Sequence, residues 1–418
     1  MKSMRSHYLA ATILTLWCAP AVAQTAPTTD EPAASDRSVR RSVSYIDLTA
    51  GVGYSSNPFL GFSNSQDSAF GRLGIRGVHA WTGERGSTTL TGFAEGTSYF
   101  NEYDLKSIFS LTADTRHEAS EKVTVFANAG ISGDLSGQLS NRFLYVPPVP
   151  DVPDATLPPP PETVQDPDLF SFAGRQYRLF GQAGAAIRTS ARSNLQISGG
   201  ASRVWFSDSL LNDYTTVFGD TSYNRFLSER TTVGASVRVE QTSYDDSNDH
   251  STLINPMLTM STRLSEFWDF DGGIGVVFSN FDRDGDKSHN VGLSLNAGLC
   301  HSSETERLCG RIARTSQSLS RGALVNTTSA NVDWYKKLDD KQTLQLSAGV
   351  SRYVSEDDLT SGFKSYYLRA AGSYSRKINN RLSGGADVSV RTLRAEGPDP
   401  DADFSGSLFL RYRLGDMD

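Results

Sequence analysis

The sequence predicts an all-β protein, a transmembrane antiparallel up-and-down β-barrel of about 18 strands, with roughly 16 to 20 as the range. Three observations lead to this prediction. The chain opens with a leader segment, apolar and polar residues alternate in one segment after another, and short charged turns alternate with longer polar connections.

Residues 1–23 have the form of a secretory signal peptide. Lys2 and Arg5 make a basic start, residues 8–17 are mostly apolar, and Ala-Val-Ala at 21–23 fits the small-x-small pattern of a cleavage site. We therefore expect export from the cytoplasm and cleavage near Ala23. The formal net charge of −7 disfavours nucleic acid as a partner.

The rest of the chain repeats one unit: a strand, a short charged turn and an alternating strand. "NRFLSERTTVGASVRVE" (224–240) and "YSRKINNRLSGGADVSVR" (374–391) are two copies. Successive charged turns lie about 36 to 40 residues apart, the length of two strands and two connections. One interval is about twice as long, and it contains the Pro-rich run from Val146 to Asp168. We expect a long Pro-rich external loop over 134–170.

The connections on the other side of the repeat are longer and rich in Asp, Ser and Asn. Short turns at one end and longer loops at the other are typical of outer-membrane barrels, so we place the charged turns in the periplasm and the longer loops outside. The barrel is expected over 44–414, after a flexible periplasmic segment at 24–43. The alternative is a soluble β-sandwich whose apolar faces meet in a core.

The first strand, "YIDLTAGVGYSSNPF" (45–59), sets the phase of the wall. Its Gly-x-Gly is no dinucleotide loop, because it lacks the third glycine and the following helix. Alternation places Ile46, Leu48 and Val52 on one face and Asp47 and Gly51 on the other. The apolar face is assigned to lipid. The following Ser-Ser-Asn-Pro is expected to start a surface loop, with Phe59 in an external aromatic girdle.

The same phase assignment in the other strands yields a charged lumen of both signs, slightly cationic, in which we expect much cross-strand pairing. The pore-lining residues predicted in this way are Arg72, Arg76, Arg116, Arg178, Arg238, Glu240, Arg263, Asp271, Arg369, Asp387, Arg391 and Arg411.

Cys300 and Cys309 flank one charged turn, and both fall on the inner phase. An exported chain with one close cysteine pair is expected to form a disulfide, with a metal site of two thiols and His301 as the less favoured alternative. The six histidines have no Ser and Asp partners at recognisable spacing. We therefore expect neither catalysis nor a cofactor.

The end of the first strand, "GVGYSSNPF", the Leu-Ser-Glu-Arg turns and the strand count resemble outer-membrane β-barrel porin family 2. The resemblance covers 45–414 and implies export of an exopolysaccharide or capsule polymer. It also implies periplasmic polysaccharide-export proteins as partners, beside the barrel-assembly machinery, outer-membrane lipid and lipopolysaccharide. One departure is the ending "GDMD", which carries the chain past the terminal aromatic residue common in such barrels.

The leading hypothesis is thus a channel for a secreted polysaccharide in the outer membrane of a Gram-negative bacterium. A general or solute-specific diffusion porin for small solutes is the alternative, in which the Pro-rich loop could narrow the pore. An outer-membrane enzyme or a surface assembly platform is the alternative from another class.

Overall fold

The computed structural model describes residues 41–60, 67–100, 105–135, 175–207, 211–245, 247–283, 286–318, 324–355, 364–395 and 401–416. These residues form 18 β-strands, which confirms the predicted fold class and strand number. The strands are β1 (Arg41–Ser55), β2 (Ser68–Gly83), β3 (Gly86–Tyr99), β4 (Lys106–Ser120), β5 (Val123–Leu135), β6 (Arg175–Ser190), β7 (Ser193–Phe206), β8 (Tyr214–Phe226), β9 (Thr231–Tyr244), β10 (His250–Arg263), β11 (Trp268–Arg283), β12 (Asp286–Ser302), β13 (Glu306–Ser318), β14 (Leu324–Lys337), β15 (Gln342–Ser355), β16 (Lys364–Lys377), β17 (Leu382–Ala395) and β18 (Asp403–Gly415).

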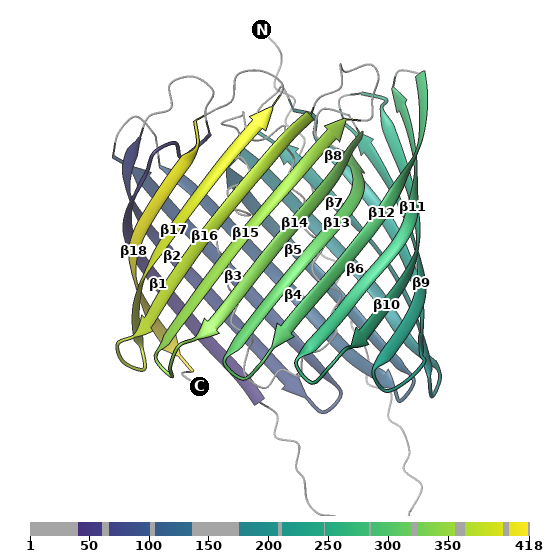
Figure 1. The fold of residues 1–418 in the computed structure, drawn as a ribbon, viewed down its shortest axis with the longest axis horizontal. Helices are drawn as coiled ribbons and strands as arrows, with labels where there is room; N and C mark the ends of the chain where they lie inside the picture. The colour runs from purple at the N-terminus through teal and green to yellow at the C-terminus, as the bar shows by residue number, and fades with distance from the viewer. Residues whose placement is uncertain are drawn as a thin grey trace, which may run out of the picture. The chain divides into compact units, whose positions relative to one another are not determined.

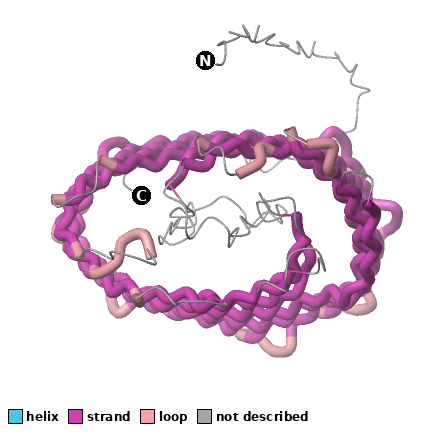
Figure 2. Tube along the Cα trace, turned by 90° about the horizontal axis from the view of Figure 1, so that it is seen from above, coloured by secondary structure: helices cyan, strands magenta, loops and turns pink. Residues whose placement is uncertain are grey.

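The strands close into one antiparallel barrel. Each strand pairs with its neighbours in the sequence. β1 pairs with both β2 and β18, so the sheet closes on itself and has no edge strand. The strands are tilted (Figure 1), and the view along the barrel shows a closed ring (Figure 2). Closure satisfies the backbone of the first and last strands. In the described residues, no helix is long and apolar enough to cross a membrane.

The barrel boundaries differ slightly from those expected. β1 begins at Arg41, because residues 41–43 continue the ladder with β2, so three residues of the expected 24–43 segment belong to the wall. β18 ends at Gly415 rather than 414. Residues 134–135 complete β5, while 136–170 and the signal peptide 1–23 lie outside the described residues.

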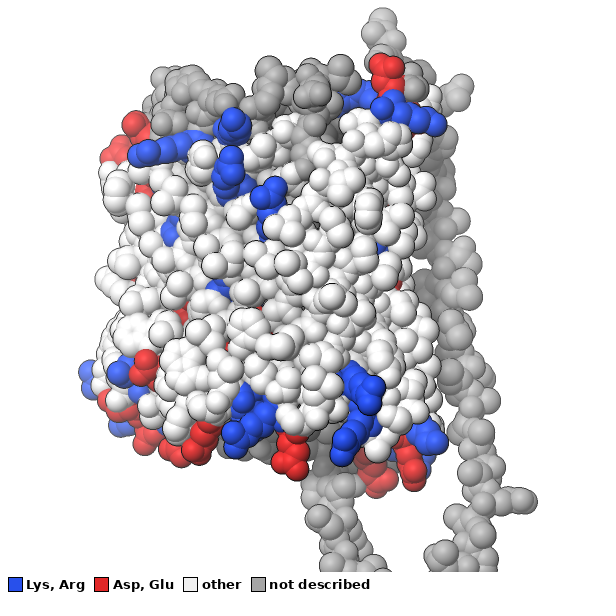
Figure 3. All heavy atoms as spheres, turned by 45° about the vertical axis from the view of Figure 1, so that its right-hand side comes forward, with Lys and Arg blue, Asp and Glu red and all other residues white. Residues whose placement is uncertain are grey.

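The outer face carries the apolar side chains. Large apolar residues such as Val52, Leu73 and Leu408 are 60%, 70% and 64% exposed. Charged side chains gather towards the two ends of the barrel, and a mostly uncharged band lies between them (Figure 3). Exposed apolar side chains between two charged ends, on a closed barrel, are suited to lipid rather than water.

The barrel has its buried apolar clusters on the inner wall, away from the short charged turns. One cluster joins Leu60, Val325, Tyr353, Tyr367 and Leu393. The second joins Tyr244, Leu253, Val277, Phe281 and Leu324. The first includes Leu60, which follows β1 and folds back against the inner wall at this end.

Candidate functional site: the charged inner wall

A row of three charges crosses the closure of the barrel. Asp47 on β1 lies opposite Arg413 on β18 and opposite Arg76 on β2. Arg413 Nε donates to Asp47 Oδ1 at 2.7 Å and Nη2 donates to Oδ2 at 2.9 Å, while the Asp47 side chain is only 5% exposed. This two-pronged geometry is the strong form of an arginine–carboxylate pair. The strands that close the sheet are therefore joined by side chains as well as by the backbone.

Arg72 makes a longer connection over the same closure. Its Nη2 lies 2.6 Å from Asp387 Oδ2, although β18 and β1 stand between β2 and β17. Gly51 on β1 leaves the room that this side chain needs. A Cβ placed there would lie 2.8 Å from Arg72 Nε and 2.9 Å from the carbonyl oxygen of Leu408. The glycine of the opening Gly-x-Gly thus serves the lumen network.

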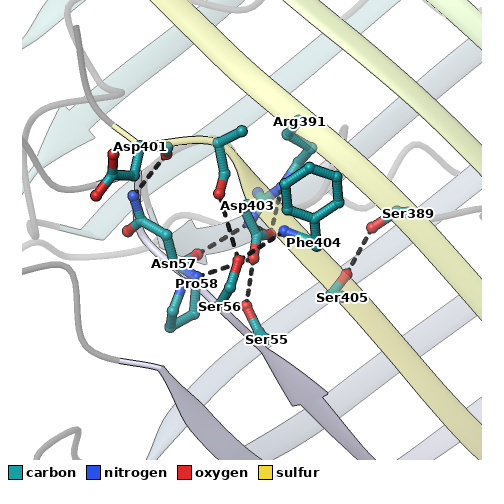
Figure 4. A network of polar contacts seen from close by, with 11 residues as sticks. Ser55, Ser56, Asn57, Pro58, Ser389, Arg391, Asp401, Asp403, Phe404 and Ser405 are labelled. Atoms are coloured by element: carbon teal, nitrogen blue, oxygen red, sulfur yellow. Dashed lines mark hydrogen bonds and ion pairs between the residues drawn. The ribbon is translucent and has the colours of Figure 1, made fainter.

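Arg391 and Asp403 form the most buried ion pair described. Arg391 Nη2 donates to Asp403 Oδ2 at 2.6 Å, and the two side chains are 12% and 1% exposed. The other carboxylate oxygen of Asp403 accepts from Ser55 Oγ at 2.6 Å and from the Asn57 backbone N–H at 3.1 Å. Figure 4 shows this network between β17, β18 and the segment after β1.

The segment after β1, Ser56–Leu60, is not the solvated surface loop expected from the sequence. Arg391 Nη2 also donates to the Pro58 carbonyl at 3.1 Å, and Leu60 packs in an apolar cluster with a positive φ of 50°. Phe59 was expected in an external aromatic girdle, but its ring packs on Tyr99, 5.5 Å away between centroids, and lies under Lys106. These bonds outweigh solvation, so the turn is held against the inner wall. We call Ser56–Leu60 the inner turn.

The opposite side of the lumen contains a second charged group. Arg238 on β9 pairs with Glu240 on the same strand at 3.0 Å, and its guanidinium lies 4.4 Å from the Phe218 ring centroid. Arg178 on β6 lies 5.7 Å from the centroid of Phe180. Stacking on aromatic faces orients both guanidinium groups, and Glu240 pairs with Arg238 as well.

The remaining predicted pore-lining residues follow the inner phase of their strands but differ in surroundings. Arg263 pairs with Asp269 at 3.6 Å beside a short turn, where both are more than half exposed. Arg369 lies directly opposite Arg391 in the ladder. Arg411 lies 5.5 Å from the Phe409 ring centroid, Asp271 leans over Gly298, and Arg116 stands near the turn end of β4.

A cavity of about 570 Å³ follows the inner wall from the short turns to the inner turn, bounded by β1–β3 and β14–β18. Nine basic and six acidic side chains line it, which leaves it cationic. The basic ones are Arg72, Arg76, Lys337, Lys341, Lys377, Arg381, Arg391, Arg411 and Arg413, and the acidic ones are Asp47, Glu95, Asp339, Asp340, Asp387 and Asp403.

Two acids at the turn end of this cavity have altered titration. The backbone N–H of Lys341 donates to Asp339 at 2.7 Å and lowers the pKa of that carboxyl. The Lys337 ammonium lies 2.7 Å from Asp340 and lowers its pKa as well. Both therefore stay ionised to a lower pH than ordinary aspartates.

Cys300 and Cys309 lie opposite each other on β12 and β13 and form a disulfide. With both thiols bonded, the alternative metal site with His301 is not formed. In the part of the chain that the structure describes, no group of three His, Cys, Asp or Glu side chains could hold a metal ion.

One serine–histidine contact bears on the enzyme alternative. Ser44 Oγ lies 2.6 Å from His79 Nδ1, at exposed positions in the outward phase of β1 and β2. The nearby carboxylate of Asp416 accepts from the Ser44 backbone N–H rather than from the imidazole. The pair thus lacks the orienting acid of a hydrolytic triad in the described contacts.

The sequence reasoning missed Asp403 and the inner turn. Asp403 shares the phase of Arg411 on β18, which was predicted to line the pore, so the alternation extended towards the start of β18 would have found it. The inner turn had no such signal, since Ser-Ser-Asn-Pro reads as an ordinary turn whichever way it bends.

Comparison with protein-family models and with curated proteins found no match. Among solved structures, the chain is similar to OpdL of Pseudomonas aeruginosa at 12% identity, over 90% of this chain and 99% of that one, with a TM-score of 0.45. The structure of OpdK of Pseudomonas aeruginosa with vanillate is similar at 12% identity, over 89% of this chain and 98% of that one, with a TM-score of 0.45. The FrpB iron transporter of Neisseria meningitidis is similar at 8% identity, over 84% of this chain and 62% of that one, with a TM-score of 0.46. Likenesses at this level assign neither a family nor a function.

Proposed function

We propose that the protein is a channel of the Gram-negative outer membrane through which polar solutes diffuse, with a preference for anions. The observation that carries the proposal is the contrast between the two faces of one closed wall. Exposed apolar side chains cover the outside, and a cationic cavity follows the inside from one end towards the other. A barrel of this strand number encloses an aqueous lumen unless chain segments fill it.

The inner turn supports selectivity rather than free diffusion. Its Phe59 and Leu60 occupy the inner wall at the end of the cavity, and the Arg391–Asp403 pair fixes them there. Chain held on the inner wall beside charged groups favours solutes by size and sign. Arg72, Arg391 and Arg413 have acidic partners, so the net preference comes from the basic residues in excess.

Planar-bilayer recording tests this proposal. The purified protein should give single-channel conductance in KCl, and a salt gradient should give a reversal potential of the sign that marks chloride as the more permeant ion. An insertion-competent barrel without conductance would sink the channel function. Conductance with cation preference would sink the selectivity alone.

Export of a polysaccharide is a second candidate, and the ion pairing inside the lumen favours it. Paired charges such as Asp47–Arg413 and Arg72–Asp387 present few strong fixed sites, so a polymer could slide past them. A clean deletion should then abolish polymer secretion while the cells keep the intracellular polymer. Secretion at the parental level in the deletion strain would leave the diffusion channel as the function.

A further inference from the structure

The ladder of the barrel is interrupted between β12 and β13. Their pairing runs from Ser302–Arg307 only to Leu295–Arg314, while β12 continues to Asp286 along β11. Residues 291–294 of β12 therefore have no ladder partner among residues 315–318, which continue β13 in the part that the structure describes. β13 itself continues to Ser318 in register with β14. We call this interruption the seam.

Beyond the seam, the end of the β13–β14 hairpin turns inward from β12, while its β14 side stays paired with β15 as far as Val325–Ser355. A wall strand exposes alternate residues, as Leu293 (47%) and Ser294 (2%) do on β12. On the hairpin, neighbouring residues are both buried: Ser316 and Gln317 at 6% and 9%, and Leu324 and Val325 at 5% and 1%. Residues that point in opposite directions can both be buried only when the segment has chain on both sides. We call residues 315–318 and 324–326 the hairpin end.

The hairpin end rests on the inner faces of β9 to β12 and not on a backbone ladder with them. Ser318 Oγ lies 2.6 Å from Ser251 Oγ on β10, and Leu324 packs among Tyr244, Leu253, Val277 and Phe281. A Cβ at Gly292 of β12 would lie 3.7 Å from Ser316 Oγ. Side-chain contacts of this kind are fewer and weaker than a continuous ladder.

Two polar groups at the seam lack the hydrogen-bond partners that a continuous ladder would supply. The backbone N–H of Val291 donates to the side-chain Oδ1 of the preceding residue, Asn290, at 2.6 Å. This local bond replaces one that a partner strand would accept. The buried amide of Gln317 has no hydrogen-bond partner among the described residues, at either Nε2 or Oε1. A buried polar group without a partner destabilises the closed arrangement, which makes the contact between the hairpin end and the wall easier to open.

The seam reaches into the lipid-facing band. On β12 the outward apolar residues run from Val291 to Leu299, which at about 3.3 Å per residue and a tilt near 40° spans roughly 20–25 Å, the height of an apolar belt. The seam overlaps the outer end of this run, at residues 291–294. Behind it lie the apolar cluster and, directly opposite Leu253 in the ladder, Glu240 with its partner Arg238.

We propose that the seam is a lateral passage between the lumen and the membrane for an amphipathic molecule, closed by the hairpin end. An apolar chain would meet Leu253, Val277 and Phe281, and an anionic or polar head would meet Arg238. The passage opens when the hairpin end lifts from β10 and β12. The inference rests on the proposed membrane location, and it adds a route that the channel along the barrel axis does not need.

Photocrosslinking to lipid tests the passage. The photoreactive residue benzoylphenylalanine replaces Leu253 in the apolar cluster behind the seam, and in a second variant Val277, so that one poorly folding protein does not decide the result. The matched control places it at Phe126, which is also inward and buried but lies on β5, away from the seam. The probe is the acyl chain of the phosphatidylethanolamine–phosphatidylglycerol vesicle that holds the barrel. We expect lipid adducts at 253 or 277 and only background at 126.

An engineered disulfide across the seam, called the staple, is the second part of the test. Gly292→Cys with Ser316→Cys should form a disulfide that fixes the hairpin end on β12, reduce the adduct to the Phe126 level, and restore it after reduction. The unstapled protein under the same oxidant and reductant controls for the Cys300–Cys309 bond. Equal adducts at the seam and control positions, or adducts indifferent to the staple, overturn the passage. Bilayer conductance of the same samples reports separately on the channel.

Discussion

Asp403→Asn is expected to destabilise the barrel strongly. Asparagine has nearly the same size and shape as aspartate, so the substitution removes only the negative charge. Arg391 would then be a cation with 12% of its side chain exposed and no carboxylate against it. Removing one partner of a buried pair typically costs about 3–5 kcal/mol. The amide oxygen can still accept from Ser55 and Asn57, so we expect the lower end, about 3 kcal/mol.

Urea unfolding of the protein in lipid vesicles, followed by the gel mobility of unheated samples, measures this loss. The matched control is Asp269→Asn, which removes a pair whose side chains are 65% and 58% exposed, and which we expect to cost less than about 1 kcal/mol. Adding Arg391→Gln to Asp403→Asn should recover part of the stability, since the unpaired charge is then gone. If Asp403→Asn and Asp269→Asn lose equally little, the Arg391–Asp403 pair does not anchor the inner turn, and the reasoning fails.

Three further outcomes are expected. Gly51→Ala should weaken the barrel and change its conductance, because the new Cβ displaces Arg72 from Asp387, whereas Gly77→Ala, with nothing within 4 Å of its Cβ, should be neutral in the same unfolding and conductance assays. Arg411→Gln should move the reversal potential in a KCl gradient towards zero without loss of folded protein, since it removes a cavity-lining cation; an unchanged potential would show that this cation does not see permeant ions. The difference in anion preference between the parent protein and Asp339→Asn should stay constant from pH 7 down past the usual aspartate range and disappear only below it, because the lowered pKa of Asp339 keeps that carboxyl charged; a difference that disappears within that range would contradict this.

The sequence by itself determined the architecture of the wall. Alternation is a local property of a strand, so Ile46 and Leu48 on one side and Asp47 on the other could be assigned from the first strand alone. The regular spacing of the charged turns then predicted the number of strands. The alternation placed Arg72, Asp387 and Arg391 on the inner face, although it did not indicate their partners.

Only the tertiary structure decided which inner charges meet and which segments turn inward. Arg72 reaches Asp387 across two intervening strands, a contact that depends on closure of the sheet and has no trace in local spacing. The hairpin end keeps strand-like alternation in sequence, yet Leu324 and Val325 are both buried because chain lies on both of its sides. Periodicity fixes the two faces of a strand, but what covers each face is set by distant residues.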